Sequence, residues 1–158
     1  MIISQACKYG LRAMVYLAQR GRAPVLSRDI AKELHIPEHF LAKILQDLSK
    51  NKLLHSFKGR GGGFRLARAP QAIRLLEVVE AIDGPDFGQG CLLGLPVCSE
   101  EAPCPLHHQW SDIKATMLHM LEQTSIQQVI EESCPLVANE PGQESGPRGD
   151  QPPVAPSA

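Results

Sequence analysis

The sequence of 158 residues predicts a mainly α-helical protein with one small β-hairpin. Three observations support this fold class. Apolar residues recur at helical spacing over most of the first 50 residues and again after residue 105. Two short strand-like runs surround a glycine-rich turn at Gly59–Gly63. Aromatic residues make up only 4% of the chain, so aliphatic side chains must form most of the core.

The N-terminal part of the chain has the pattern of a helix-turn-helix. Apolar spacing predicts a first helix over residues 3–20, with Gly21 at its C-terminal cap. Ser27 can cap a short second helix. Pro37 can occupy the first position of a third helix, because the N–H that proline lacks is not needed there. The apolar side of this third helix is expected to consist of Phe40, Leu41, Ile44, Leu45 and Leu48.

A β-hairpin is expected directly after these helices. Its strands are predicted within residues 53–58 and 64–66, on either side of the glycine-rich turn. A helix-turn-helix followed at once by a hairpin is the element order of a winged helix. A fourth helix is expected over Ile73–Ile82, before the turn at Asp83.

A long helix is expected from Pro105 to about Gln123. Its apolar residues recur at spacings of three and four, which is typical of the contact line between packed helices and favours dimerisation. Ser125 can cap a last short helix that runs through Glu132. The apolar residues of the long helix are Leu106, Trp110, Ile113, Met117 and Met120.

The formal net charge of −1 conceals two halves of opposite sign. Residues 1–75 contain 14 Lys and Arg and four Asp and Glu, a charge of +10, whereas residues 76–158 have a charge of −11. A basic half of this strength indicates a polyanionic partner. The chain has no apolar run near the roughly 20 residues of a membrane span, and its start lacks a secretory pattern. We therefore expect a cytoplasmic protein without a membrane segment.

The basic half is best interpreted as a DNA-binding module. On the third helix His39, Lys43 and Gln46 face away from the apolar side, as required of side chains that reach bases in a major groove. Lys58 and Arg60 flank the glycines of the hairpin turn, where they suit a minor groove. An ordinary solvated helix face and a merely flexible turn are the alternatives. A phosphate-binding Walker loop is excluded, because no Lys-Ser/Thr pair follows the glycines. Ser27, at the start of the second helix, completes the predicted DNA-binding set.

Three of the five cysteines, Cys91, Cys98 and Cys104, lie within 14 residues and are followed by His107. An odd number of cysteines in a chain expected in the cytoplasm argues against a disulfide framework. Three thiolates and an imidazole can hold zinc or an iron–sulfur cluster. The spacing alone leaves an iron–sulfur cluster, zinc and uncoordinated thiols equally open. His108 is expected to point elsewhere, because it lies about 100° further around the helix.

Two other cysteines are expected to lie outside this cluster. Cys7 falls on the apolar face of the first helix, where a cysteine is usually a packed small hydrophobic residue. Cys134 adjoins the C-terminal tail and is interpreted as a spare thiol.

The order of these parts resembles a bacterial family of winged-helix transcription regulators that includes IscR, NsrR, RirA and CymR. The resemblance covers residues 1–132, and it depends on the Lys8–Met14 segment, the Gly59–Phe64 turn and the cysteine loop. The segment Cys104–Trp110 is most similar to the IscR branch. The resemblance implies a homodimer that binds an imperfect palindrome in double-stranded DNA. Lys8 stands where the nitric-oxide-sensing NsrR branch has an acidic ligand, which favours a 2Fe–2S cluster, although 4Fe–4S stays possible. The ligands that the resemblance implies are Cys91, Cys98, Cys104 and His107.

These features predict a DNA-binding transcription regulator and not an enzyme. Its affinity for an operator would be switched by an iron–sulfur cluster that responds to iron or cluster supply or to redox state. The alternative is a regulator of the same fold that senses nitric oxide or uses zinc or cysteine oxidation. A small redox protein or cluster carrier is disfavoured, because no Cys-x-x-Cys pair or nucleotide-binding loop accompanies the cysteines. An adaptor that binds an acidic protein is a further alternative.

We accordingly expect four segments along the chain. They are a winged-helix DNA-binding domain over residues 1–83, a cluster-binding loop over 84–104, dimerisation helices over 105–134 and a disordered tail over 135–158.

Overall fold

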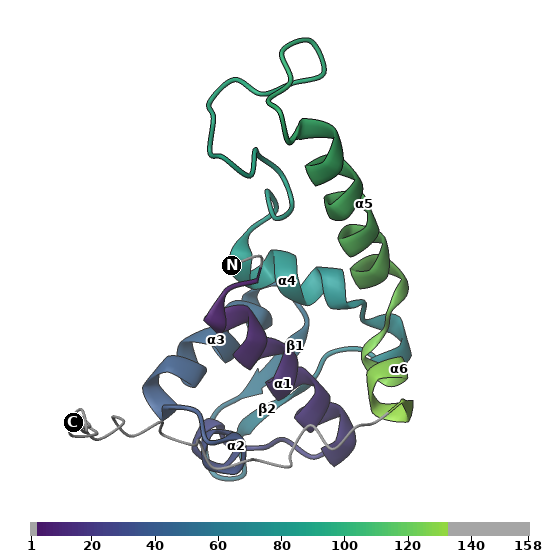
Figure 1. Cartoon of the computed structure of the whole chain (residues 1–158). Coiled ribbons are helices and arrows are strands. Elements are labelled where there is room, and N and C mark those ends of the chain that lie inside the picture. Colours follow the sequence, from purple (N-terminus) through teal and green to yellow (C-terminus); the bar gives the residue numbers. More distant parts are fainter. Residues whose placement is uncertain (1–2, 133–158) are drawn as a thin grey trace, which may run out of the picture.

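The computed structural model describes residues 3–132 (Figure 1). The predicted tail over 135–158 and the thiol of Cys134 lie outside the described residues. The elements in chain order are the helices α1 (Gln5–Arg20), α2 (Ser27–Leu34) and α3 (Glu38–Lys50), the strands β1 (Leu54–Phe57) and β2 (Gly63–Leu66), the 3-10 turn η1 (Pro70–Ala72), and the helices α4 (Leu75–Asp83), α5 (His107–Gln123) and α6 (Ile126–Glu131). This confirms the predicted mainly α-helical fold with a small hairpin.

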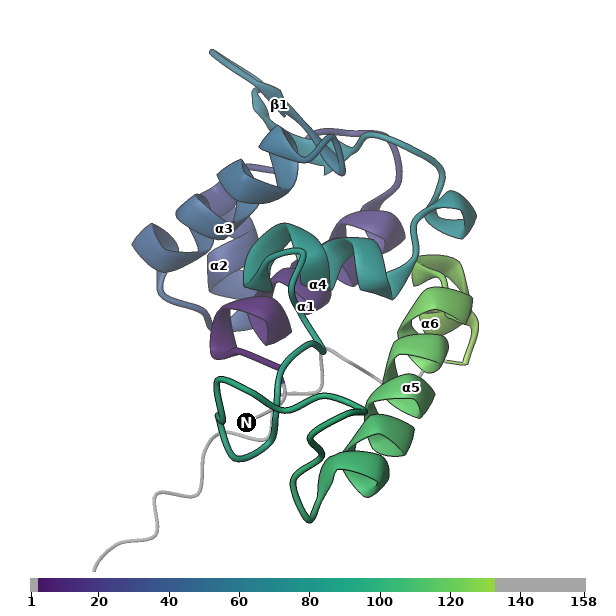
Figure 2. The ribbon, with the colours of Figure 1, turned by 90° about the horizontal axis from the view of Figure 1, so that it is seen from above.

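Helix α1 lies at the centre of the molecule and packs against α3, α4 and α6 (Figures 1 and 2). The hydroxyl of Ser4 accepts a hydrogen bond from the backbone N–H of Cys7 and thereby caps α1. The buried core is aliphatic, as the scarcity of aromatic residues predicts. Its fully buried large side chains include Met14, Leu17, Ile30, Leu34, Leu41, Leu45, Leu48, Leu53, Leu54 and Ile73.

Two helix starts differ by one position from the sequence-based expectation. Ser27 is the first residue of α2 and not its cap, since Leu26 occupies the cap position without a side-chain hydrogen bond. Pro37 caps α3, and its carbonyl oxygen accepts the backbone N–H groups of Phe40 and Leu41. Phe40 is 37% exposed at the edge of the expected apolar side, with its ring edge-on to Tyr9 at 5.9 Å between ring centroids.

Helix α4 begins two residues later than predicted, because a distant segment pairs with its expected first turn. Ile73 is fully buried in extended backbone, and its carbonyl accepts the N–H of Ile126 at 3.0 Å. The N–H of Leu75 in turn donates to the carbonyl of Thr124 at 3.0 Å. These contacts hold residues 73 and 74 in extended backbone beside the start of α6, so the helix begins only at Leu75.

The hairpin pairs β1 with β2 in antiparallel register, and Phe57 lies opposite Gly63. Val25, in the connection between α1 and α2, exchanges two backbone hydrogen bonds with Phe64 at 2.8 and 2.9 Å. Gly63 has φ +133°, and a Cβ atom there would lie 2.4 Å from the carbonyl carbon of Val25. This glycine therefore permits the close approach that fixes the hairpin to the helical body.

Helix α5 extends away from the helical body, and the loop between α4 and α5 lies beside its first turns (Figures 1 and 2). A second apolar cluster joins this region to α1 and α4 through Cys7, Val79, Phe87, Met117 and Leu121. Further along α5, Ile113 and Met120 stay 53% and 54% exposed. No helix within residues 3–132 has both the length and the apolarity needed to cross a membrane.

Candidate metal centre

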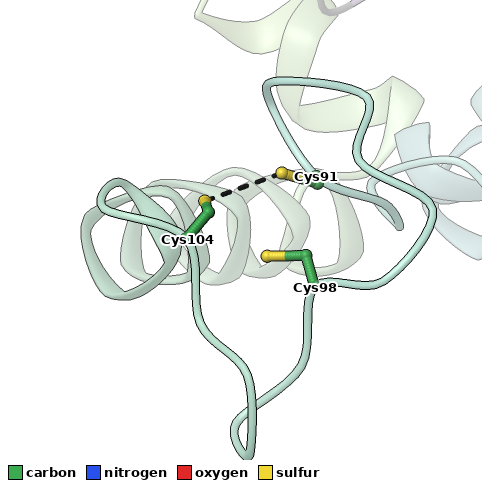
Figure 3. Close-up of side chains that lie close together, drawn as sticks. All are labelled: Cys91, Cys98 and Cys104. Carbon is green, nitrogen blue, oxygen red and sulfur yellow. Dashed lines mark hydrogen bonds between the residues drawn. The ribbon is translucent and has the colours of Figure 1, made fainter.

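The loop before α5 brings three cysteine sulfurs together. The Sγ atoms of Cys91, Cys98 and Cys104 all lie within 4.8 Å of one another, and those of Cys91 and Cys104 are 3.7 Å apart (Figure 3). The three side chains are half-buried and point into a common space. The clustering expected from their positions in the sequence is therefore present in the structure.

His107 lies directly against this cluster. The backbone N–H of His107 donates to the carbonyl of Cys104 at 3.0 Å, and this turn leads into α5. Its Nδ1 atom is 3.1 Å from the sulfur of Cys98. The helix start thus places an imidazole nitrogen beside one of the three sulfurs, and the role of His107 as a ligand stays a prediction.

A carboxylate contacts the other nitrogen of the same imidazole. Nε2 of His107 lies 3.1 Å from a carboxylate oxygen of Glu100. The His107 side chain is only 13% exposed, whereas that of Glu100 is 78% exposed. When Nε2–H donates to Glu100, the lone pair of Nδ1 faces the cysteines, the arrangement that metal-ligating histidines generally have. The hydrogen bond with His107 also lowers the pKa of Glu100.

The acidities of the clustered thiols differ. Hydrogen bonds from the backbone N–H groups of Leu95 and Leu93 lower the pKa of Cys91 to about 7. For Cys98, the backbone hydrogen bond from Cys104 opposes the shift, but partial burial and the neighbouring sulfurs raise the pKa. One thiol of the cluster is therefore about half ionised at pH 7 even without a bound metal.

Two side chains of α5 attach the cysteine loop to the helix. The indole N–H of Trp110 and the ammonium of Lys114 both donate to the carbonyl of Gly90, at 3.2 and 3.1 Å. Both side chains line a cavity of about 80 Å³ together with the three cysteines and His107. The cysteine loop is thus joined to α5 at Gly90 as well as at Cys104.

Glu100 and Lys114 contact the centre, but neither was recognised from the sequence. His108 has a ring nitrogen within 4.8 Å of ligand atoms of His107 and Glu100, in a group that contains none of the three cysteine sulfurs. The bend of the loop brings Glu100 back to the helix start, and nothing in the spacing of Glu100 indicates this contact. The place of Lys114 beside the centre could have been inferred, since it is the single Lys or Arg between residues 76 and 132 and follows His107 by two helical turns.

Cys7 lies away from the centre, as expected. It is fully buried in the second apolar cluster, and burial together with the nearby carboxylate of Asp83 raises its pKa to about 12. This thiol stays protonated and packed.

The predicted DNA-binding residues lie on the outer side of the helical body. His39, Lys43 and Gln46 are exposed along α3, and Lys58 and Arg60 are exposed in the turn between β1 and β2. Ser27 is half-buried in the first turn of α2.

The profile of the Rrf2 family, described as an iron-dependent transcriptional regulator, matches residues 3–132. The chain belongs to the Rrf2 family. An HTH-type transcriptional regulator of Aquifex aeolicus is 37% identical over 132 residues, which cover 82% of this chain and 92% of the relative. The regulator CymR of Bacillus subtilis is 27% identical over 128 residues, covering 80% of this chain and 88% of CymR.

Solved structures agree with this Rrf2 assignment. The structure of Bacillus subtilis CymR, described as a global cysteine regulator, matches with a TM-score of 0.70 at 26% identity, over 85% of this chain and 99% of CymR. The structure of T. potens IscR matches in fold with a TM-score of 0.66 at 24% identity, over 83% of this chain and 87% of IscR. The Rrf2 relatives are transcription regulators and not enzymes, and the same class holds for this chain.

Proposed function

We propose that this Rrf2 protein is a homodimeric, DNA-binding regulator whose operator affinity is switched by an iron–sulfur cluster. The observation behind the proposal is the meeting of three cysteine sulfurs within 4.8 Å of one another, with the imidazole Nδ1 of His107 at 3.1 Å from one of them. Cys91, Cys98, Cys104 and His107 would hold the cluster.

The chemistry of these donors fits an iron–sulfur group. Thiolates are the usual ligands of such clusters, and imidazole ligands raise the reduction potential. A bound cluster would supply a one-electron redox change and sensitivity to iron supply and oxidants. Glu100 orients His107, while Lys114 places a positive charge beside the thiolates.

The arrangement of the ligands suggests how regulation reaches the DNA. The cluster would be bound both by the cysteine loop and by the first residue of α5. Its presence would therefore hold residues 84–104 in one conformation. The hydrogen bonds from Trp110 and Lys114 to Gly90 would couple the conformation of this loop to the position of α5. Because α5 packs on α4 and also presents exposed Ile113 and Met120, its position can set the spacing of two recognition helices in a dimer.

A 2Fe–2S cluster is the form we propose, with cysteine oxidation or zinc binding as the second candidate. The 3.7 Å between the sulfurs of Cys91 and Cys104 supports cysteine oxidation, since a modest movement of the loop would allow a disulfide. Metal analysis distinguishes a bound iron–sulfur cluster, bound zinc and metal-free cysteines.

The decisive experiment is anaerobic purification followed by quantitation of iron and acid-labile sulfide. We expect roughly two iron and two sulfide per chain with visible absorption, as a 2Fe–2S cluster requires. DNA binding of the cluster-loaded and cluster-free forms should then differ. Absence of iron, sulfide and visible absorption would refute the proposed cofactor, and zinc in their place would establish the second candidate.

Replacement of single ligands tests the assignment of the centre. Cys98→Ala should lose most of the iron, because one of four ligands is removed, and should then respond weakly to cluster state in DNA binding. Cys134→Ala, at a thiol outside the described residues, is the matched control and should retain full iron content. Equal iron in both variants would contradict the proposed ligand set.

Replacement of the DNA-binding residues should have the opposite effect, a loss of DNA affinity without a loss of iron. Lys43→Ala on α3 and Arg60→Ala in the hairpin turn should each weaken DNA binding by roughly fivefold to tenfold while leaving the iron content unchanged. Electrophoretic mobility shift with promoter DNA measures this, and Cys98→Ala serves as the reciprocal control. Unchanged affinity in both variants would argue against the proposed DNA interface, which also includes Ser27, His39, Gln46 and Lys58.

A further inference from the structure

The outer face of the hairpin borders a cavity that lies apart from the cysteine centre. In the antiparallel register His55 lies opposite Arg65, while the neighbouring pair of Leu54 and Leu66 faces the core. Arg22, in the turn after α1, and the segment after β2 complete the cavity, which has a volume of about 510 Å³. A cavity of this size can hold a ligand as large as a mononucleotide.

The charge of this cavity is strongly positive. Arg22, Arg65 and Arg68 line it together with His55, and no Asp or Glu is among its lining residues within the described chain. Arg68 is partly neutralised, because it pairs with Glu77 and donates to the carbonyl of Ala72. Arg22 and Arg65 are the arginines of the cavity that form no ion pair with an acidic side chain within residues 3–132.

The guanidinium of Arg65 is held in a defined orientation. Its central carbon lies 4.8 Å from the ring centroid of Phe57, so the group stacks on an aromatic face. One nitrogen of the same group donates to the backbone carbonyl of Arg22 at 3.4 Å. A guanidinium that is already oriented loses little conformational freedom when an anion binds, and its planar shape matches two phosphate oxygens.

We propose that this wing-base pocket, lined by Arg22, His55, Arg65 and Arg68, binds a phosphate group, with Arg65 as its principal ligand. The phosphate can come from the backbone of DNA beside the hairpin turn or from a free phosphorylated small molecule. The pocket is independent of the proposed iron–sulfur centre, and it adds residues that the DNA-binding set above does not include.

The test uses the full chain and two matched variants. Arg65→Gln removes the proposed ligand. Arg20→Gln is the control, because Arg20 also stacks on an aromatic ring, at 4.9 Å from the centroid of Tyr16, but lies outside the pocket. Circular dichroism melts verify folding, and Arg65→Lys provides a second variant that keeps the charge but loses the planar fork.

Two measurements distinguish the sources of phosphate. The first is calorimetric titration with inorganic pyrophosphate in the absence of DNA, in which Arg65→Gln should weaken binding about tenfold if the ligand is a small molecule. The second is the slope of log affinity against log salt for sheared double-stranded DNA. Arg65→Gln should reduce this slope by about 0.9 if the pocket holds one backbone phosphate.

Each outcome decides the proposal. Loss of pyrophosphate binding in Arg65→Gln but not in Arg20→Gln establishes a small-molecule site. A reduced salt slope in the same variant alone establishes a DNA phosphate site. Arg65→Lys should fall between wild type and Arg65→Gln in whichever measurement responds. If Arg65→Gln matches Arg20→Gln in both measurements, or if Arg65→Gln is unfolded and Arg65→Lys equals wild type, the proposal is overturned.

Discussion

The thiols of Cys7 and Cys91 illustrate how local surroundings give one residue type opposite properties. Cys7 is fully buried among apolar side chains, so its charged form is disfavoured and its pKa rises to about 12. Cys91 accepts hydrogen bonds from the backbone N–H groups of Leu95 and Leu93, which stabilise the thiolate and lower its pKa to about 7. Reactivity should therefore differ strongly between the two.

In the metal-free, reduced chain, limiting iodoacetamide at pH 7.5 should modify Cys91 at least about tenfold faster than Cys7. The thiolate form of Cys91 grows as the pH rises through 7, so its rate should fall at pH 6 and level off above pH 8. Cys7 stays protonated and inaccessible over this whole range. Peptide mass spectrometry measures both rates, and denaturant should make them similar. Equal rates in the native chain would contradict the assigned environments.

At the scale of elements, the hairpin depends on a close backbone contact as well as on its strand pairing. Val25 pairs with Phe64, and the carbonyl of Val25 occupies the space where a side chain at position 63 would begin. Gly61, in the turn, has φ +80° but open space around its Cα. Both glycines have positive φ, and only Gly63 also has the steric contact with Val25.

Gly63→Ala should destabilise the protein by roughly 1–3 kcal/mol, because the new methyl group meets backbone strain and also displaces the Val25 segment. Gly61→Ala should lose only about 1 kcal/mol, since it meets backbone strain without a clash. Urea unfolding followed by circular dichroism provides both values. A smaller loss for Gly63→Ala than for Gly61→Ala would show that the contact with Val25 is not required.

At the scale of the whole molecule, charge and apolar surface occupy different parts. The basic residues that give the first 75 positions their charge of +10 belong to the helical body and hairpin. Helix α5 extends from that body and presents Ile113 and Met120. Large apolar side chains on an extended helix are suited to contact with a second copy of the chain.

If the chain is a homodimer through α5, Ile113→Glu should convert it to a monomer, because a carboxylate would be buried without a partner. Ala115→Glu, on another side of the same helix, should remain dimeric and serves as the control. Size-exclusion chromatography with light scattering gives the mass directly. A monomeric wild type, or no difference between the variants, would contradict the proposed dimer.

Several errors of the sequence-based expectations have a common physical cause. The late start of α4 results from backbone hydrogen bonds of Ile73 and Leu75 with Ile126 and Thr124 at the start of α6, more than 45 positions away in the chain. The unexpected contact of Glu100 with His107 results from the bend that returns the loop to the helix start. Neither depends on local periodicity, so neither could be inferred from it. Phe40 follows the expected spacing but lies at the edge of the buried stripe, where the pattern cannot resolve exposure.

The order of helices and hairpin, the basic character of the first half and the grouping of three cysteines before a long helix could all be predicted from the sequence alone. These follow from periodicity, composition and spacing, which are local properties of a chain. Three contacts became known from the folded structure alone. Glu100 contacts His107, Lys114 contacts Gly90, and the guanidinium of Arg65 lies in a positively charged pocket. Such contacts join residues whose separation in sequence bears no relation to their distance in space, because the packing of the core brings their elements together.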